Sequence, residues 1–407
     1  SAKKWPEELI NNIVGNHYDG QHNIRPGDSA VPQGIQPLPL TPQTQYLGVL
    51  LDAGRHYYPT RWIKNLLDTL YVLRYNLVHF RLTDDQAFSA NLTSQPNLAM
   101  PAFGYNHTYS VGELRDLVAY AQARNITLMP EVNMPGHAGG WGNIPGLVLD
   151  CPKFACTKAY GIPLDISNPR LLGIVRDVLM ELRDIFSTSD YFHLGGDEVH
   201  MAMPCFRELG LQIYDYNSFE QDLKKILKEV GIPQAKVLRW ETTGQKANWR
   251  AGDMTQWWLS HPSEPRNRAT AKNASYFISA GLYMDTDLNA NAWNLYSRAR
   301  EWGLKKDHPL PTAIVAGTFE LGKEEWFEKN IVGRLLGIAI AATGDVYDNA
   351  TAFERVYDEH CRATGIDPRL CKLRGTPIDA AKHRTMNWRP VMRGKWGKIM
   401  CEEVKTR

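Results

Sequence analysis

The chain has 407 residues, 43% of them hydrophobic and 22% charged, which is typical of a globular protein long enough for one large α/β barrel. The formal net charge is only +2, so the overall charge gives no indication of nucleic-acid binding. No run of 18 or more apolar residues occurs, so we expect no membrane span.

The predicted fold begins after an irregular entry segment. Residues 19–44 are rich in Pro, Gly and Gln, and we assign residues 1–45 to an N-terminal segment without its own core. From Tyr46 onward, short apolar runs recur, as expected for parallel strands buried on both faces. The eight candidate strands are Tyr46–Leu51, Leu77–Leu82, Ile126–Glu131, Tyr191–Leu194, Lys236–Trp240, Met254–Trp258, Tyr276–Ala280 and Leu335–Ile340.

Amphipathic patterns between these strands predict helices. They cover Thr60–Tyr75, Leu171–Phe186 and Ser218–Val230, and a further helix begins at Ser110, where Ser110 and Glu113 form a capping box. Strands that alternate with helices predict an α/β protein with a (β/α)8 TIM barrel.

The barrel is expected to occupy residues 46–360. The remaining residues, 361–407, form a C-terminal extension that we expect to pack on the barrel. This extension is basic, with ten Lys and Arg against three Asp and Glu in residues 372–407.

Cysteines and glycosylation motifs bear on the cellular compartment. No signal stretch opens the chain, so either the protein is cytosolic or a signal was removed before Ser1. Six cysteines allow fifteen pairings, and closeness in sequence favours Cys151–Cys156 and Cys361–Cys371, which leaves Cys205–Cys401. Five Asn-x-Ser/Thr motifs begin at Asn91, Asn106, Asn125, Asn273 and Asn349. The even cysteine count and the motifs favour a disulfide-bonded glycoprotein of the secretory pathway, either extracellular or lysosomal.

The most informative segment is an apolar run, Tyr191–Leu194, followed by two glycines and then Asp197 and Glu198. Two adjacent acids in a pocket cannot both ionise cheaply, so one should hold its proton towards neutral pH. A protonated acid beside an ionised one is what cleavage of a glycosidic bond needs. An acidic helix N-cap with an acidic neighbour is the structural alternative.

Other predicted strands also end in polar or aromatic side chains, and in such barrels catalytic groups lie at the carboxyl ends of the strands. An acidic pocket with one Arg and several aromatic residues is typical of a carbohydrate site. The candidates are Asp52, Arg55, Asp84, Asp85, Glu131, Asn133, His137, Trp240, Glu241, Trp257, Trp258, Tyr283, Asp285, Thr343 and Asp345.

Four segments resemble the β-N-acetylhexosaminidases of glycoside hydrolase family 20. They are Gly48–Pro59, Leu82–Gln86, Pro130–His137 and His193–Glu198, in the family's order and at barrel spacing. The resemblance implies a retaining mechanism without an enzyme nucleophile, in which the substrate's 2-acetamido group attacks the anomeric carbon and forms an oxazolinium ion. The implied substrate is a glycan or chitooligosaccharide that ends in N-acetylhexosamine, and no metal or organic cofactor is implied.

The resemblance also implies roles for individual residues. Glu198 would be the general acid and then the general base, Asp197 would hold the acetamido N–H, and Tyr283 would donate a hydrogen bond to the acetamido oxygen. By the same resemblance, Arg55 would hold sugar hydroxyls and Asp285 would bind outer hydroxyls. Trp240, Trp258 and Trp257 would form the wall of the acetamido pocket. Asp84, His137 and Glu131 would lie behind Asp197 and Glu198 and orient them without contacting the substrate.

The chain departs from the family pattern at the third and last strands. Asn133 stands where the family usually has Asp, and Thr343 and Asp345 stand where its last strand ends in Trp-x-Glu. Asp345 could still bind a hydroxyl, but Thr343 cannot supply a stacking ring. Either another aromatic residue, Trp326 or Trp302, fills that place, or the sugar subsite is looser. A disaccharide-releasing member of the family and a glycan-binding protein with weakened turnover therefore remain open alternatives. The sequence does not fix the oligomeric state, and members of the family are often homodimers.

Overall fold

The computed structural model confirms the predicted barrel. It describes residue 31 and residues 36–102, 106–151, 161–212, 215–241, 254–259, 275–284, 290–304, 310–319 and 324–364. Eight parallel strands close into a barrel in the order β1, β10, β9, β8, β7, β6, β5, β2. Their bounds are β1 (Tyr46–Asp52), β2 (Leu77–Arg81), β5 (Thr127–Glu131), β6 (Phe192–His193), β7 (Val237–Trp240), β8 (Met254–Trp257), β9 (Tyr276–Ile278) and β10 (Ala313–Ala316).

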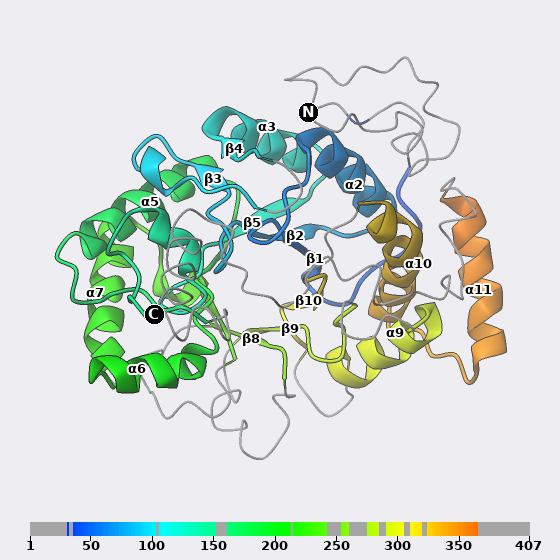
Figure 1. Cartoon of the computed structure of the whole chain (residues 1–407). Coiled ribbons are helices and arrows are strands. Elements are labelled where there is room, and N and C mark those ends of the chain that lie inside the picture. Colours follow the sequence, from blue (N-terminus) through cyan, green and yellow to red (C-terminus); the bar gives the residue numbers. More distant parts are fainter. Residues whose placement is uncertain are drawn as a thin grey trace.

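Helices surround the strands, and helix α11 lies outside α9 and α10 (Figure 1). The α-helices are α2 (Thr60–Val72), α3 (Val111–Gln122), α5 (Leu171–Ile185), α6 (Met203–Leu209), α7 (Tyr216–Glu229), α9 (Ala292–Arg298), α10 (Glu324–Ala342) and α11 (Ala350–Ala363). The capping box predicted at Ser110 is present, because Ser110 accepts the backbone N–H of Glu113 and Glu113 accepts that of Ser110.

Short elements complete the described chain. They are β3 (Ala90–Asn91) and β4 (Tyr109–Ser110), the 3-10 turns η1 (Pro96–Leu98), η2 (Gly139–Asn143), η3 (Val199–Ala202) and η5 (Gln234–Lys236), and the π-helical turn η6 (Ala299–Gly303).

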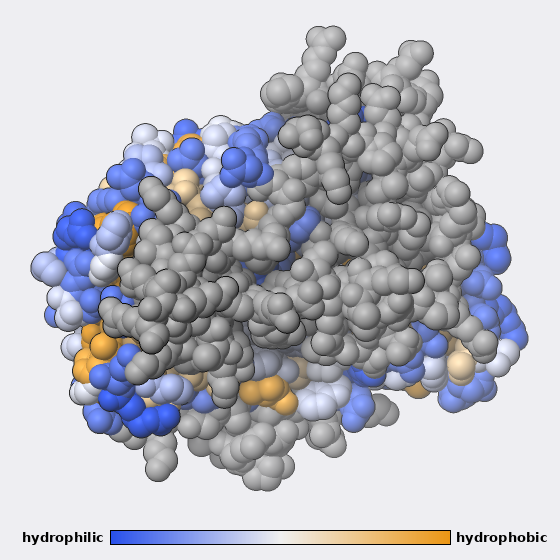
Figure 2. Space-filling model, in the orientation of Figure 1, coloured by the Kyte–Doolittle hydropathy of each residue, from blue (hydrophilic) through white to orange (hydrophobic). Residues whose placement is uncertain are grey.

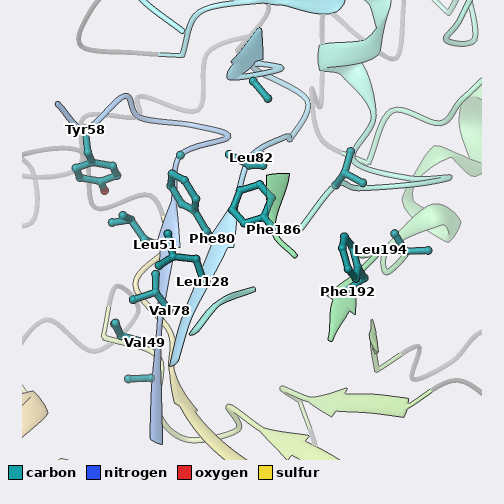
Figure 3. Packing of buried hydrophobic residues seen from close by; sticks show 14 of the residues in the cluster. Val49, Leu51, Tyr58, Val78, Phe80, Leu82, Leu128, Phe186, Phe192 and Leu194 are labelled. Atoms are coloured by element: carbon teal, nitrogen blue, oxygen red, sulfur yellow. The ribbon is translucent and has the colours of Figure 1, made fainter. Parts of the chain in front are cut away.

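Alternation along the strands builds two apolar layers. Val49 and Leu51 of β1 face outward, where they pack with Val78 and Phe80 of β2 under the helices, as Figure 3 shows. Leu50 faces the barrel interior and belongs to a separate, smaller cluster. Each fully buried side chain of this kind contributes about 1.5–3 kcal/mol relative to an exposed one. The two layers hold the strand ends in fixed positions, which a catalytic site requires.

The predicted eighth strand is wrong. Residues Leu335–Ile340 lie in helix α10, and the barrel is closed by β10, which pairs with β1 and β9. A short apolar run does not distinguish a strand from a buried helix. The sequence pattern of α10 is especially hard to distinguish from that of a strand, because every residue from Ile331 to Ala342 is buried and this part of the helix has no polar face.

The structure describes the chain on both sides of the two expected domain boundaries, after residue 45 and after residue 360. Leu38 and Leu40 of the entry segment are buried, and the Gln43 N–H donates to the carbonyl of Ala342 at 2.8 Å, so this part packs on the barrel. Helix α11 continues across the expected boundary after residue 360, with Cys361 buried. Packing of the extension beyond residue 364 lies outside the described residues and stays a prediction.

The described disulfide differs from the expected pairing. Cys151 is bonded to Cys205, with their Cα atoms 5.5 Å apart, so the expected Cys151–Cys156 and Cys205–Cys401 pairs are wrong. Closeness in sequence failed because the bond joins the loop after β5 to helix α6, two segments that the barrel places side by side.

The described surface is polar over α7 and α11 in Figure 2, with only small apolar areas. In the described part of the chain, no helix is long and apolar enough to cross a bilayer.

Candidate active site

The segment that carries the adjacent acids has an unusual backbone. Gly195, Gly196 and Glu198 have φ values of 59°, 88° and 52°, in the left-handed region that favours glycine. A Cβ atom at Gly195 would lie 1.7 Å from Oδ1 of Asn133, so no other residue fits there. Left-handed backbone at Glu198 costs about 1 kcal/mol or more, and such strain is typical of functional sites. It turns Asp197 and Glu198 to the end of the barrel.

A chain of hydrogen bonds stands behind Glu198. Its Oε2 lies 3.0 Å from Nε2 of His137, whose Nδ1 lies 3.0 Å from Oδ1 of Asp84. Burial raises the pKa of Asp84, but Arg55, Arg81 and His137 outweigh it and hold that pKa well below its usual range. The ionised Asp84 in turn outweighs the burial of His137 and raises the pKa of the imidazole well above its ordinary value.

The two adjacent acids have opposite shifts. Burial raises the pKa of Asp197, Glu198 raises it further, and His137 only partly offsets this. Burial also raises the pKa of Glu198, but the hydrogen bond and charge of His137 outweigh it and lower that pKa. Among the described residues, no group donates a hydrogen bond to Oδ1 of Asp197, although Asp197 is only 8% exposed. Of the two acids, the one whose pKa is raised is Asp197, and not Glu198, to which the sequence analysis gives the role of general acid.

Three carboxylates and two guanidinium groups lie beneath this pair. Nη1 of Arg55 is 2.9 Å from Oδ2 of Asp52, and its Nη2 is 3.0 Å from Oδ2 of Asp84. Nη1 of Arg81 is 2.8 Å from Oε1 of Glu131, and its Nε is 2.9 Å from Oδ2 of Asp84. The alternation of charges offsets much of the cost of burying them.

Aromatic rings form the opposite side of the site. Trp240 lies 5.6 Å from Phe319, Phe319 stacks on Tyr283 at 5.1 Å, and Tyr283 lies 6.1 Å from Trp258, all between ring centroids. The indole N–H of Trp240 donates to Glu131 at 2.8 Å, and that of Trp258 donates to the carbonyl of Glu241 at 3.0 Å. These four rings, which we call the aromatic wall, suit the apolar face of a sugar.

Comparison with known proteins decides the family. The catalytic domain of glycosyl hydrolase family 20 matches residues 45–306, which is more than half of the chain. The chain belongs to glycoside hydrolase family 20. The match ends at residue 306, before β10.

Curated relatives of this family 20 chain are β-hexosaminidases. It is 36% identical to β-hexosaminidase subunit A1 of Dictyostelium discoideum over 39% of the chain and 30% of that protein. It is 25% identical to the human β-hexosaminidase subunit beta over 79% of the chain and 61% of that protein. The chain thus spans less than two thirds of the length of these curated relatives.

Solved structures share the fold. The exo-β-N-acetylglucosaminidase of Vibrio harveyi superposes with a TM-score of 0.62 at 19% identity, over 80% of this chain and 59% of that one. A further family 20 β-N-acetylglucosaminidase superposes with a TM-score of 0.62 at 22% identity, over 80% and 76% of the two chains. At these identities the likeness shows a common barrel.

Two residues expected in the pocket of this family 20 chain lie elsewhere. Trp257 packs in the outer apolar layer, because side chains alternate along β8 and its neighbours Gln256 and Trp258 face inward. Asp345 follows the end of helix α10, next to Thr343, whose hydroxyl donates to it at 3.0 Å. That end of α10 contacts Gln43, just before β1, and therefore lies at the opposite end of the barrel from the acids.

Phe319 is the functional candidate that sequence reasoning missed. It follows β10, and it was overlooked because α10 was taken for the last strand. The run Ala313–Ala316, followed by Gly317, Thr318 and then an aromatic residue, was the signal that could have found it. Phe319 places a ring in the aromatic wall, where it stacks on Tyr283, whereas Asp285 lies outside the described residues.

Three groups of His, Asp and Glu side chains in the described core have the spacing of metal ligands. Both ring nitrogens of His137, which belongs to two of these groups, face carboxylates, and its raised pKa favours the doubly protonated ring, which has no lone pair for an ion. The third group consists of His79, Glu131 and His193. Nε2 of His79 lies 2.7 Å from Oε2 of Glu131, and Nδ1 of His193 accepts a hydrogen bond from the Gly195 N–H.

Proposed function

We propose that the chain is an exo-acting, retaining β-N-acetylhexosaminidase that removes terminal β-linked GlcNAc or GalNAc by substrate-assisted catalysis. One observation carries this proposal, namely the unsatisfied Oδ1 of buried Asp197 next to Glu198 and its His137–Asp84 chain. A buried carboxylate oxygen without a donor costs free energy, and an acetamido N–H is a donor of the right kind.

In the first step, the acetamido oxygen of the substrate attacks the anomeric carbon, and the bond to the leaving oxygen breaks. Glu198 gives its proton to that oxygen, and the positive charge spreads over the oxazolinium ring. Asp197 accepts the acetamido N–H and stabilises this charge, and Tyr283 orients the acetamido oxygen. Intramolecular attack has a large proximity advantage, so the enzyme needs no nucleophile of its own.

In the second step, Glu198 takes a proton from water, and the oxygen of that water attacks the anomeric carbon. The oxazolinium ring opens, the acetamido group is restored, and Glu198 is protonated again. Because two attacks occur on opposite faces, the product keeps the β configuration, which is the meaning of retention.

Substrate binding should reverse the order of the two acidic pKa values. Without substrate, the pKa of Asp197 is raised and that of Glu198 is lowered, whereas the first step needs the opposite order. An acetamido N–H bound to Asp197 favours its ionised form. A sugar that covers the Glu198 side chain, which is 25% exposed, removes water and favours its protonated form.

The aromatic wall would line the acetamido pocket and face the sugar ring, and Arg55 would hold sugar hydroxyls. Phe319 weakens the case for a disaccharide-releasing enzyme, since that alternative was motivated by Thr343 in place of a stacking ring. A glycan-binding protein with weakened turnover remains the second candidate, and only hydrolysis separates it from the first.

The test compares a chromogenic β-N-acetylglucosaminide with the matching β-glucoside, using the wild type and Glu198→Gln. We expect cleavage of the acetamido substrate alone, and loss of that cleavage in the variant. Equal cleavage of both substrates would contradict substrate assistance. A folded wild type that binds N-acetylglucosamine and cleaves neither substrate would favour the glycan-binding protein.

We also propose that the protein is a secreted or lysosomal glycoprotein. Asn91, Asn106, Asn125 and Asn349 are exposed and can accept a glycan, and the Cys151–Cys205 bond suits an oxidising compartment. Mobility on a denaturing gel before and after enzymatic removal of N-linked glycans tests this. Unchanged mobility of protein made in a eukaryotic secretory host would contradict it.

A further inference from the structure

A buried guanidinium joins the two sides of the site without facing the substrate. Arg81 ends strand β2, and its side chain is 2% exposed. Its Nε and Nη2 bond to Oδ2 of Asp84, and its Nη1 bonds to Oε1 of Glu131 at 2.8 Å. The planar fork of Arg can hold two carboxylates at fixed angles, which Lys cannot do.

Each of these two carboxylates is connected by hydrogen bonds to a different part of the site. Asp84 leads through His137 to Glu198, the candidate acid and base. Glu131 accepts the indole N–H of Trp240 on the same Oε1 atom that Arg81 contacts, so it leads to the aromatic wall. One side chain therefore connects the proton-transfer groups with the wall of the acetamido pocket.

The positive charge of Arg81 neutralises buried carboxylates of the site. Asp52, Asp84 and Glu131 present three buried carboxylates, and Arg55 and Arg81 are the two guanidinium groups that contact them among the described residues. Without Arg81, Glu131 would lose its guanidinium partner, while Asp84 would keep Arg55. A buried carboxylate that loses its partner is strongly destabilised or takes up a proton.

We propose that Arg81 is a positioning residue for hydrolysis, which holds the Asp84–His137–Glu198 chain and the Glu131–Trp240 contact in register and supplies the positive charge that faces Asp84, Glu131 and Asp197. This inference rests on the proposed function. It assigns Arg81 no contact with the substrate. It therefore separates Arg81 from Arg55, whose expected role is to hold sugar hydroxyls.

Removal of the Arg81 charge should shift the pH–rate profile in one direction. The groups that act on Asp197 are His137 and Arg81, which favour its ionised form, and Glu198 and Glu131, which oppose it. Removing the Arg81 charge should raise the pKa of Asp197. Since the ionised form of Asp197 stabilises the oxazolinium charge, the acid limb of the pH–rate profile should then move to higher pH.

The experiment uses Arg81→Met, which removes the charge, and Arg81→Lys, which keeps the charge but loses the fork. We expect Arg81→Met to lower kcat about tenfold or more and to move the acid limb upward by about half a pH unit or more. Arg81→Lys should keep the limb near its wild-type position but raise KM, because Glu131 and Trp240 lose their fixed partner. Arg81→Lys also provides the test if Arg81→Met does not fold.

Arg124→Met is the matched control. Arg124 is also buried, at 1% exposed, and it is paired with Asp68 between helices α2 and α3, away from the site. Its loss should lower the melting temperature without changing the pH profile or KM. If folded Arg81 variants also keep the wild-type profile, kcat and KM, Arg81 is only structural and the inference is overturned.

A second measurement needs no turnover and separates this inference from the proposed function. The pKa of the Asp197 carboxyl can be followed by 13C NMR, with Asp197→Asn to assign the signal. It should be higher in Arg81→Met than in the wild type, and an unchanged value overturns the inference. A wild type that hydrolyses nothing, combined with a higher Asp197 pKa in Arg81→Met, overturns the proposed function but keeps the effect of Arg81 on Asp197.

Discussion

The two halves of the barrel contribute different chemistry. Charged groups lie at the ends of strands β1, β2, β5 and β6, whereas aromatic rings lie at the ends of β7, β8, β9 and β10, with the charged Glu241 directly after β7. The charged set is Arg55, Asp84, His137, Asp197 and Glu198, and the aromatic set is Trp240, Trp258, Tyr283 and Phe319.

The two sets are also held in different ways. In the charged half, neighbouring groups touch through hydrogen bonds of about 3 Å, as between Glu198 and His137. In the aromatic half, ring centroids lie 5–6 Å apart, as between Phe319 and Tyr283. Substitutions in a hydrogen-bonded charge network change the neighbours as well, while substitutions in ring packing act more locally.

The largest expected effect follows from Glu198→Gln in the charged half. The amide cannot donate an acidic proton or accept one from water, so kcat should fall about a thousandfold while the fold is kept. Steady-state kinetics beside a thermal melt would check both parts. A variant as fast as wild type would show that another group is the acid.

The next effect, about a hundredfold in kcat, is expected for Asp197→Asn. Its amide keeps the shape but has no charge to stabilise the oxazolinium ion. The double variant Asp197→Asn with Glu198→Gln should lose less than the product of the single losses, because the two acids are coupled. If the two losses multiply in this double-mutant cycle, the two acids act independently, which would contradict the proposed coupling within the charged half.

A smaller effect is expected for Phe319→Leu in the aromatic half. Loss of one ring contact is worth about 0.5–1.5 kcal/mol, which corresponds to a KM raised about threefold to tenfold with little change in kcat. Phe353→Leu is the control, since Phe353 is fully buried between helices outside the barrel. An unchanged KM for Phe319→Leu, measured on the acetamido substrate, would remove Phe319 from the site.

The smallest effect on activity is expected from loss of the disulfide. Replacing Cys151 and Cys205 by Ala removes a link across 54 residues, so the free energy of unfolding should fall by about 2–4 kcal/mol with little change in KM. Thermal and denaturant unfolding measure this loss. Peptide mapping of the wild type without reduction supplies the complementary check, and a Cys151–Cys156 peptide would contradict the observed pairing.

The sequence by itself determined the charged half. Its residues come in continuous segments, Pro130–His137 and His193–Glu198, because a tight backbone after a strand fixes several neighbours at once. The repeated apolar runs also predicted the barrel and seven of its eight strands, as expected for strands buried on both faces. These features are local, and local patterns can be read from one sequence.

Only the tertiary structure decided the rest. The last strand, the place of Phe319, the outward position of Trp257 and the Cys151–Cys205 bond all depend on which segments become neighbours in space. A single aromatic residue after a short strand has no distinctive pattern, and a fully buried helix such as α10 has the apolar content of a strand. Arg81 shows the same limit, because its bridge between Asp84 and Glu131 joins two strands that lie 50 residues apart in the sequence.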